Sequence, residues 1–153
     1  DNGVCDIGVV GKDTIMEMGG TFYEVADLGF GKCRFALALP QGVDFYEGYH
    51  TRRIASKYVN VARGFFERKN MDVSIVKIEG SVELAPILGL SDAIVDIVET
   101  GTTLRENGLV VAEYICDVSA RLIVNIASLK LRKAEIEPLI ARIEDYLAGE
   151  ETE

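Results

Sequence analysis

Short apolar runs alternate with segments of helical periodicity along the chain, and this order constrains the fold more than any other feature. The runs at 6–10, 32–39 and 93–98 are bounded by glycine, proline or polar residues, which is typical of buried strands. Helical patterns lie between them, at 13–18 and 52–69. Strands that alternate with helices favour mainly parallel sheets with helices on their faces. The sequence therefore predicts an α/β fold of that kind.

The remaining predicted elements continue this order and end in a helix. We expect a strand at 73–78, a short helix from Ser81 to Leu88, a helical turn at 103–107, strands at 109–116 and 120–126, and a helix at 133–147. Asp13 and Ser81 are predicted N-caps, because such side chains accept hydrogen bonds from the first amides of a helix. Pro138 leaves the start of the last helix open by several residues, because proline lacks an amide hydrogen.

Two strongly apolar strands, at 33–39 and 120–126, flank the central part of the chain. This arrangement suits two lobes joined by two crossing strands, with the central block forming a lobe inserted into the other. We therefore expect residues 1–37 and 119–153 to form the first lobe and residues 38–118 the second. Ligands of such folds bind at the carboxyl ends of the strands.

Composition and charge exclude several classes of function. The formal net charge is -9, so the phosphate backbone of nucleic acids would be repelled overall. No apolar run approaches the ~20 residues that a membrane helix needs. The first residues of the printed sequence have neither the basic segment nor the apolar core of a signal peptide. We expect a cytoplasmic protein that binds neither nucleic acid nor membrane.

The cysteines and the single histidine point away from redox, zinc or histidine-based chemistry. Cys5, Cys33 and Cys116 lie in apolar runs without metal-ligand spacing, which predicts reduced and mostly buried thiols. His50 lies in a polar, glycine-containing stretch and is predicted to be a surface loop residue.

The run DAIVDIVETGTT, residues 92–103, has the composition of an anion-binding loop. A buried strand ends in a small-residue loop that opens a helical turn. Gly101 permits a close backbone approach, successive amides can point into one concavity, and the helix start adds positive potential. The hydroxyls of Thr100, Thr102 and Thr103 can donate further hydrogen bonds. The pattern predicts a phosphate site.

Two acids precede this loop, and a phosphate would repel them. Asp96 and Glu99 therefore need another task, and they suit sugar hydroxyls or Mg²⁺, since hard cations prefer carboxylates. The plain structural interpretation is that residues 99–101 form a turn and Thr102 caps a helix. The acids weigh against it, because a turn does not require them.

Taken together, the segments of the chain resemble the ATP phosphoribosyltransferase family, which catalyses the first step of histidine biosynthesis. The matching segments, in the family's order, are 6–13 (DIGVVGKD), 27–34 (DLGFGKCR), 53–58 (RIASKY), 80–86 (GSVELAP), 89–96 (GLSDAIVD) and 99–104 (ETGTTL). The resemblance covers nearly the whole chain, and the combination is highly specific.

The resemblance implies a two-lobed fold similar to type 2 periplasmic binding proteins. It also implies transfer of a phosphoribosyl group from phosphoribosyl pyrophosphate to N1 of ATP, with Mg²⁺. In that case residues 100–103 would hold the 5-phosphate, Asp96 and Glu99 would face the ribose, and Glu83 would line the same cleft. Gly11 and Asp13 would lie on the nucleotide side.

Members of this family begin with a further segment that carries a strand and a Lys-Gly-Arg loop. The resemblance implies the short form of the catalytic subunit without that segment, so whether this chain turns over alone stays open. The short form works as a homo-oligomer with a regulatory subunit related to histidyl-tRNA synthetase.

Residue patterns alone leave two other interpretations open. A noncatalytic anion-binding or effector-sensing module on the same scaffold is the alternative function, because a fold does not fix an activity. The basic residues Arg52, Arg53, Lys57 and Arg63 suit either a face that attracts polyphosphates or a solvated helix face, and the second is commoner.

Overall fold

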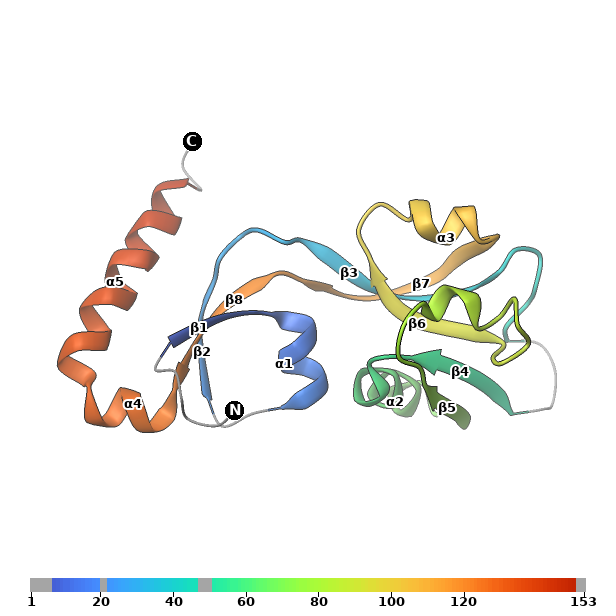
Figure 1. Ribbon diagram of the computed structural model, residues 1–153, viewed down its shortest axis with the longest axis horizontal. Helices are drawn as coiled ribbons and strands as arrows, with labels where there is room; N and C mark the ends of the chain where they lie inside the picture. The colour runs from blue at the N-terminus through green and yellow to red at the C-terminus, as the bar shows by residue number, and fades with distance from the viewer. Residues whose placement is uncertain (1–6, 20–21, 47–50, 151–153) are drawn as a thin grey trace. The chain divides into compact units, whose positions relative to one another are not determined.

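The computed structural model describes residues 7–19, 22–46 and 51–150, and the chain divides into two compact units. The first unit comprises Asp1–Lys32 and Val118–Glu153, and the second comprises Cys33–Asp117. Figure 1 shows the elements of both units. The chain crosses between them at 32/33 and 117/118, whereas the sequence predicted crossings at 37/38 and 118/119.

The first unit contains a three-stranded sheet and three helices. Its elements are β1 (Ile7–Gly11), α1 (Lys12–Met18), β2 (Phe22–Asp27), β8 (Ala120–Asn125), α4 (Ile126–Leu131) and α5 (Lys133–Glu150). The strand order is β1-β8-β2, and β8 runs antiparallel to both neighbours. β1 and β2 therefore run in the same direction, as a β-α-β unit requires, but β8 lies between them. The prediction of mainly parallel sheets is wrong for this unit.

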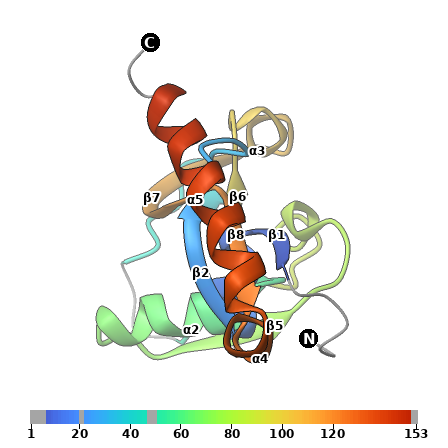
Figure 2. The same ribbon diagram turned by 90° about the vertical axis from the view of Figure 1, so that its left-hand side faces the viewer.

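The described core of the first unit is small. Val118, Leu122, Val124 and Ile136 are its buried apolar side chains, and α1 buries none. Asn125 caps α4, since its side-chain oxygen accepts hydrogen bonds from the amides of Ala127 and Ser128. α4 meets α5 at a bend, and Figure 2 shows α4 end-on with α5 rising from it. The sequence predicted neither β2 nor α4.

The second unit contains a five-stranded sheet. Its elements are β3 (Cys33–Pro40), β4 (Arg52–Ser56), α2 (Val59–Arg68), β5 (Val73–Lys77), the 3₁₀ helix η1 (Val82–Leu84), β6 (Ala93–Val98), α3 (Thr102–Glu106) and β7 (Leu109–Val118). The strand order is β5-β4-β6-β3-β7; β4 is parallel to β5 and β6, while β3 is antiparallel to β6. This sheet is therefore mixed, and all of β3 belongs to it, which places the first crossing before Cys33.

Both faces of this sheet are covered, as the long apolar runs predicted. Successive residues of β3 point to opposite faces, yet Phe35, Ala36 and Leu37 are all fully buried. One face packs against η1 and α3 through Val82 and Leu104. α2 buries Val61, Ala62, Phe65 and Phe66 and lies on the opposite side of the sheet in Figure 1. The core therefore fixes β6 in the middle of the unit.

Residues 52–56 form a strand, although the sequence predicted a helix from 52 to 69. Ile54 and Ala55 are fully buried between β5 and β6. Their spacing to Tyr58 and Val61 also fits a helical stripe. The predicted helix therefore began too early, at residue 52. Only 59–68 is helical, and Arg52 and Arg53 therefore do not belong to a basic helix face.

Several smaller expectations also differ from the structure. Gly11, not Asp13, is the N-cap of α1, and Ser81 occupies the N-cap of η1 without a side-chain hydrogen bond. Cys33 and Cys116 form no disulfide, as expected, but they are only half-buried, because one begins β3 and the other lies on the edge strand β7. Cys5 and His50 lie outside the described residues. Within those ranges no helix is long and apolar enough to cross a membrane.

A buried serine hydroxyl lies just before β6. Ser91 is 4% exposed, and its Oγ has no hydrogen-bond partner among the residues that the structure describes. Because an unpaired buried hydroxyl costs free energy, we expect Ser91→Ala to raise the free energy of unfolding by roughly 1 kcal/mol in urea titrations. Ser56→Ala is the matched control. Ser56 Oγ donates to Val95 O at 2.6 Å and accepts from Tyr58 N at 2.9 Å, so its loss should destabilise. Equal effects from both variants would contradict this assignment.

Candidate anion-binding site

The predicted loop follows the central strand of the second unit. β4 and β5 run parallel to β6, so the carboxyl ends of all three strands lie at one edge of the sheet. Ala55 pairs with Ile94, which places the residues after β4 beside the second half of β6. The hydrogen bond from Ser56 Oγ to Val95 O joins the strands there. This edge is the usual ligand position in such sheets.

Asp96 is the partly buried acid of this edge. Its Oδ1 accepts a hydrogen bond from Ile97 N at 2.9 Å. Burial raises the pKa of Asp96 above 3.8, and the nearby charge of Glu83 adds to the rise, while the Ile97 amide and the ammonium of Lys57 oppose it. Asp96 belongs to β6, Glu83 to η1, and Lys57 directly follows β4; Glu83 and Lys57 both interact electrostatically with Asp96. A carboxylate whose pKa is perturbed by burial and by charged neighbours is typical of functional sites.

The loop itself is exposed and depends on one left-handed residue. Gly101 has φ +79° and ψ 3°, a conformation that favours glycine, and it forms the N-cap of α3. The hydroxyls of Thr100 and Thr102 are 3.0 Å apart, and both residues are exposed, as are Glu99 and Thr103. The loop hydroxyls and Glu99 therefore lie along one stretch of exposed chain, and the partly buried Asp96 precedes this stretch.

α3 begins at Thr102, one residue earlier than predicted, and has only five residues. Buried Leu104 anchors it to the core of the second unit. So short a helix contributes little dipole, and the sequence-based expectation of added positive potential is weak here. The positive charge near the loop comes instead from a side chain.

That side chain is Arg105, which sequence reasoning missed. Its Nη1 donates to Thr100 O at 3.2 Å, and its Nη2 donates to Thr102 Oγ1 at 3.3 Å. A Cβ placed on Gly101 would lie 3.1 Å from Nη1, so the guanidinium packs against the glycine. The only signal in the sequence is an arginine three residues after Thr102, which helical geometry places on the same face.

The two residues predicted on the nucleotide side, Gly11 and Asp13, lie in the first unit. Gly11 ends β1, and a Cβ there would lie 2.1 Å from Asp13 Oδ1, so the carboxylate of Asp13 folds back over the glycine. The structure thus brings these two residues together at the start of α1. Glu83, Asp96 and the loop form a separate group in the second unit.

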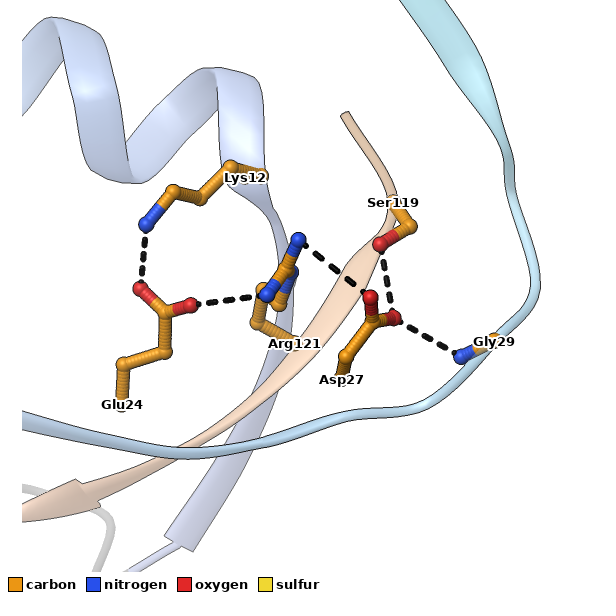
Figure 3. Close-up of polar contacts among 6 residues, drawn as sticks. All are labelled: Lys12, Glu24, Asp27, Gly29, Ser119 and Arg121. Atoms are coloured by element: carbon orange, nitrogen blue, oxygen red, sulfur yellow. Dashed lines mark hydrogen bonds and ion pairs between the residues drawn. The ribbon is translucent and has the colours of Figure 1, made fainter. Parts of the chain in front are cut away.

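Figure 3 shows the polar network around Glu24 and Asp27, which includes Lys12 of α1. Glu24 accepts from Lys12 Nζ at 2.6 Å and from Arg121 Nη1 at 3.1 Å, which ties α1 to β2 and β8. Asp27 accepts from Ser119 Oγ at 2.7 Å and from Gly29 N at 2.9 Å. These two hydrogen bonds hold the pKa of Asp27 below its usual range. Lys12 is therefore paired within the first unit.

In the part of the chain that the structure describes, no group of three or more His, Cys, Asp or Glu side chains is arranged to hold a metal ion. Asp96 and Glu83 supply two carboxylates. Mg²⁺ commonly takes one or two carboxylates and completes its octahedron with water and substrate phosphates. The donor set fits Mg²⁺ held jointly with a phosphorylated substrate.

Comparison with solved structures defines the class of fold. The arginine-bound, truncated ArgBP of Thermotoga maritima matches with a TM-score of 0.55 at 12% identity, over 83% of this chain and 60% of that chain. The aliphatic sulphonate binding protein SsuA of Escherichia coli matches with 0.60 at 11%, over 95% and 56%. At such identities these matches show the fold alone. They confirm a periplasmic-binding-protein-like α/β fold.

The family follows from closer matches. The family model HisG: ATP phosphoribosyltransferase matches residues 1–145, and the chain belongs to this family. The ATP phosphoribosyltransferase of Clostridium kluyveri is 60% identical over 144 residues, covering 94% of this chain and 66% of that protein. That of Clostridium acetobutylicum is 57% identical over 150 residues, covering 98% and 70%. The chain thus spans about two thirds of the length of these relatives.

One solved structure within the family also matches closely. The ATP phosphoribosyl transferase (HisG:HisZ) complex from Thermotoga maritima superposes with a TM-score of 0.85 at 35% identity. The match covers 96% of this chain and 72% of that chain. The resemblance stated from the sequence motifs is confirmed at the level of the family.

Proposed function

We propose that this chain transfers the phosphoribosyl group of phosphoribosyl pyrophosphate to N1 of ATP, the first step of histidine biosynthesis. One observation carries the proposal beyond family membership. A partly buried Asp96, with Glu83 and Lys57 nearby, lies in the second half of the strand that leads into the left-handed glycine loop. A simple phosphate receptor gains nothing from two acids, whereas a ribose and a metal-bound pyrophosphate use them.

The loop and the acids would have separate tasks. The amides and hydroxyls of residues 100–103 would bind the 5-phosphate, since amides that converge on one concavity favour an anion. Asp96 and Glu99 would accept hydrogen bonds from the ribose hydroxyls, and Glu83 would line the same edge. No described nucleophile has an adjacent base in this group, which suits direct displacement at the anomeric carbon. Positioning of the two substrates would supply most of the rate.

Mg²⁺ would be held by Asp96 and Glu83 together with the pyrophosphate. When bound, it neutralises the charge that develops on the leaving pyrophosphate. The ammonium of Lys57 opposes part of the rise in the pKa of Asp96 and would favour the ionised form of that carboxylate. Gly11 and Asp13 would contribute to the nucleotide side from the first unit.

The family also suggests how the protein works in the cell. We propose a cytoplasmic homo-oligomer with a regulatory subunit related to histidyl-tRNA synthetase. The proposal is supported by the Thermotoga maritima neighbour, whose structure is described as a HisG:HisZ complex.

The first test is binding, and the expected result is a Mg²⁺-dependent heat. We expect phosphoribosyl pyrophosphate with Mg²⁺ to bind this chain in calorimetry, and chelation of Mg²⁺ to weaken binding by about tenfold or more, since each tenfold is about 1.4 kcal/mol. No heat and no thermal shift at millimolar ligand, with a folded sample, would reject the site.

The second test is turnover. We expect pyrophosphate release that depends on ATP, measured with and without the regulatory subunit. Tight binding of phosphoribosyl pyrophosphate without any ATP-dependent release in either condition would favour the noncatalytic module instead.

A further inference from the structure

We propose that Arg105 is the positioning residue that sets the phosphate-binding conformation of the loop, through the shape of its guanidinium as well as its charge. This inference rests on the proposed function, because the loop is assigned there to the 5-phosphate. Arg105 lies outside every motif that carried the family resemblance. It acts through its hydrogen bonds to Thr100 and Thr102 and is not itself a phosphate ligand in this assignment.

The first contact fixes the direction of a peptide group. Arg105 Nη1 donates to Thr100 O at 3.2 Å. In a trans peptide the carbonyl and the following N–H point in opposite directions. Holding Thr100 O toward Arg105 therefore turns the N–H of Gly101 away from the guanidinium and toward the open side of the loop. An anion on that side meets a donor that is already oriented.

The second contact fixes a hydroxyl. Arg105 Nη2 donates to Thr102 Oγ1 at 3.3 Å, so this oxygen acts as an acceptor. Because a hydroxyl has one proton and two lone pairs, the proton of Thr102 stays available for donation. It can go to Thr100 Oγ1, 3.0 Å away, or to a phosphate oxygen. The guanidinium thus makes Thr102 a donor toward the ligand.

The backbone of Arg105 closes the same turn. Arg105 N donates to Gly101 O at 3.1 Å, and Gly108 N donates to Arg105 O at 3.1 Å. Arg105 therefore forms hydrogen bonds with both Thr100 and Gly101, and the neighbouring Leu104 anchors α3 in the core. A rigid loop of this kind binds a phosphate without an ordering penalty at the moment of binding.

Arginine and lysine differ in this role. A planar guanidinium can donate to two acceptors at once in a fixed geometry, whereas an ammonium acts as a single compact charge. Arg105→Lys keeps the positive charge near the loop but cannot reproduce the fork between Thr100 O and Thr102 Oγ1. The variant separates positioning from simple electrostatic attraction.

The experiment measures ligand binding and loop motion in the same variants. We expect Arg105→Lys and Arg105→Ala each to weaken phosphoribosyl pyrophosphate by about tenfold, as for the loss of hydrogen bonds made by a charged group, with the affinity for ATP unchanged. Guanidinium at millimolar concentration should partly restore binding to Arg105→Ala. Without ligand, the amide of residue 105, which donates to Gly101 O in the wild type, should exchange hydrogen faster in both variants. Arg63→Lys, an exposed α2 arginine that donates to Asn60, is the control and should change neither quantity.

The outcomes separate this inference from the proposed function. Wild-type binding in Arg105→Lys together with unchanged amide exchange would overturn the positioning role. Loss in Arg105→Ala with full recovery in Arg105→Lys would overturn it too, since charge alone would then suffice. If the wild-type chain binds no phosphoribosyl pyrophosphate, the proposed function fails. The exchange rates then decide alone: faster exchange in Arg105→Lys upholds the positioning role, and unchanged exchange rejects it.

Discussion

Gly101→Val should abolish phosphoribosyl pyrophosphate binding while the protein still unfolds cooperatively. Gly101 has φ +79°, where a β-branched residue is strained, and relief of that strain would rotate the peptides on either side. We expect the free energy of unfolding to fall by about 1–3 kcal/mol. A loop residue carries little of the core, so the second unit should stay folded. Calorimetry and thermal melts on the same samples measure both effects.

The structure changes the reason for this expected loss. The close backbone approach that the sequence predicts at Gly101 would make any side chain there block the phosphate. A Cβ there would instead meet Arg105 Nη1 at 3.1 Å and Val98 Cγ1 at 3.8 Å. The valine would therefore displace the guanidinium and disturb the amides indirectly. Binding should be lost because the loop is reshaped and not because the ligand is blocked.

Gly42→Val is the matched control for this variant. Gly42 also has a left-handed backbone, with φ +82°, and a Cβ there would meet nothing within 4 Å. We expect a similar loss of stability from strain but normal binding. Binding by Gly101→Val at the level of the parent would reduce residues 99–101 to a plain turn and remove the main support for the site.

The strand that leads into the site could be predicted from sequence because its burial is local and complete. Ala93, Ile94 and Val95 are fully buried on both faces of the sheet, so the first half of β6 is a continuous apolar run. The predicted bounds, 93–98, match the structure. The left-handed conformation of Gly101 was not predicted as such, but it agrees with the glycine at that position, since only glycine adopts it readily.

The parts that the sequence did not predict depend on contacts between distant segments. β2 is half-exposed, and its charged residues Glu24 and Asp27 find their partners on α1 and β8 (Figure 3). No local sequence pattern indicates ion pairs between residues so far apart in the chain. Residues 52–56 were predicted to be helical because the spacing of Ile54 to the next apolar residues fits a helix as well as a strand. Their position between β5 and β6 makes them the strand β4.

The composition of the site also depends on tertiary structure. Glu83, Lys57 and Asp96 come together because β4, β5 and β6 are parallel and end at one edge. The sequence alone ordered these residues along the chain and not in space. Arg105 was missed for a related reason: its role exists only once Gly101 turns the backbone and presents Thr100 O to the guanidinium.

Asp96→Asn is expected to weaken Mg²⁺-dependent binding of phosphoribosyl pyrophosphate by roughly 10- to 100-fold, in the range of lost interactions with a charged group. The amide keeps the shape of the side chain, and its oxygen can still accept from Ile97 N as Oδ1 does at 2.9 Å. Removal of the negative charge replaces one charged Mg²⁺ ligand by a weaker, neutral one. Free phosphate should bind equally well or better, because a like charge near it has gone. Titrations of both ligands, with and without Mg²⁺, measure the difference.

The same variant should be more stable than the parent at neutral pH. Burial and the charge of Glu83 raise the pKa of Asp96, so the folded state binds its proton more tightly than the unfolded state does. Stability from this group therefore falls as pH rises from about its ordinary pKa of 3.8 through the raised value. Above that window the ionised carboxylate destabilises the fold, and asparagine removes the penalty. The melting temperature of the variant should exceed that of the parent at pH 7 and approach it in acid.

Asp92→Asn provides the opposite case at the other end of β6. Asp92 Oδ2 accepts from Arg53 N at 2.8 Å, and its Oδ1 lies 3.7 Å from Arg53 Nη2, so its charge supports the fold. We expect lower stability with unchanged Mg²⁺ dependence. Asp96→Asn should gain stability and lose ligand binding, whereas Asp92→Asn should lose stability and bind normally. This contrast would identify Asp96 as a residue kept for its chemistry. If Asp96→Asn lost stability and kept Mg²⁺-dependent binding, its carboxylate would be structural and the assignment to ribose and metal would fall.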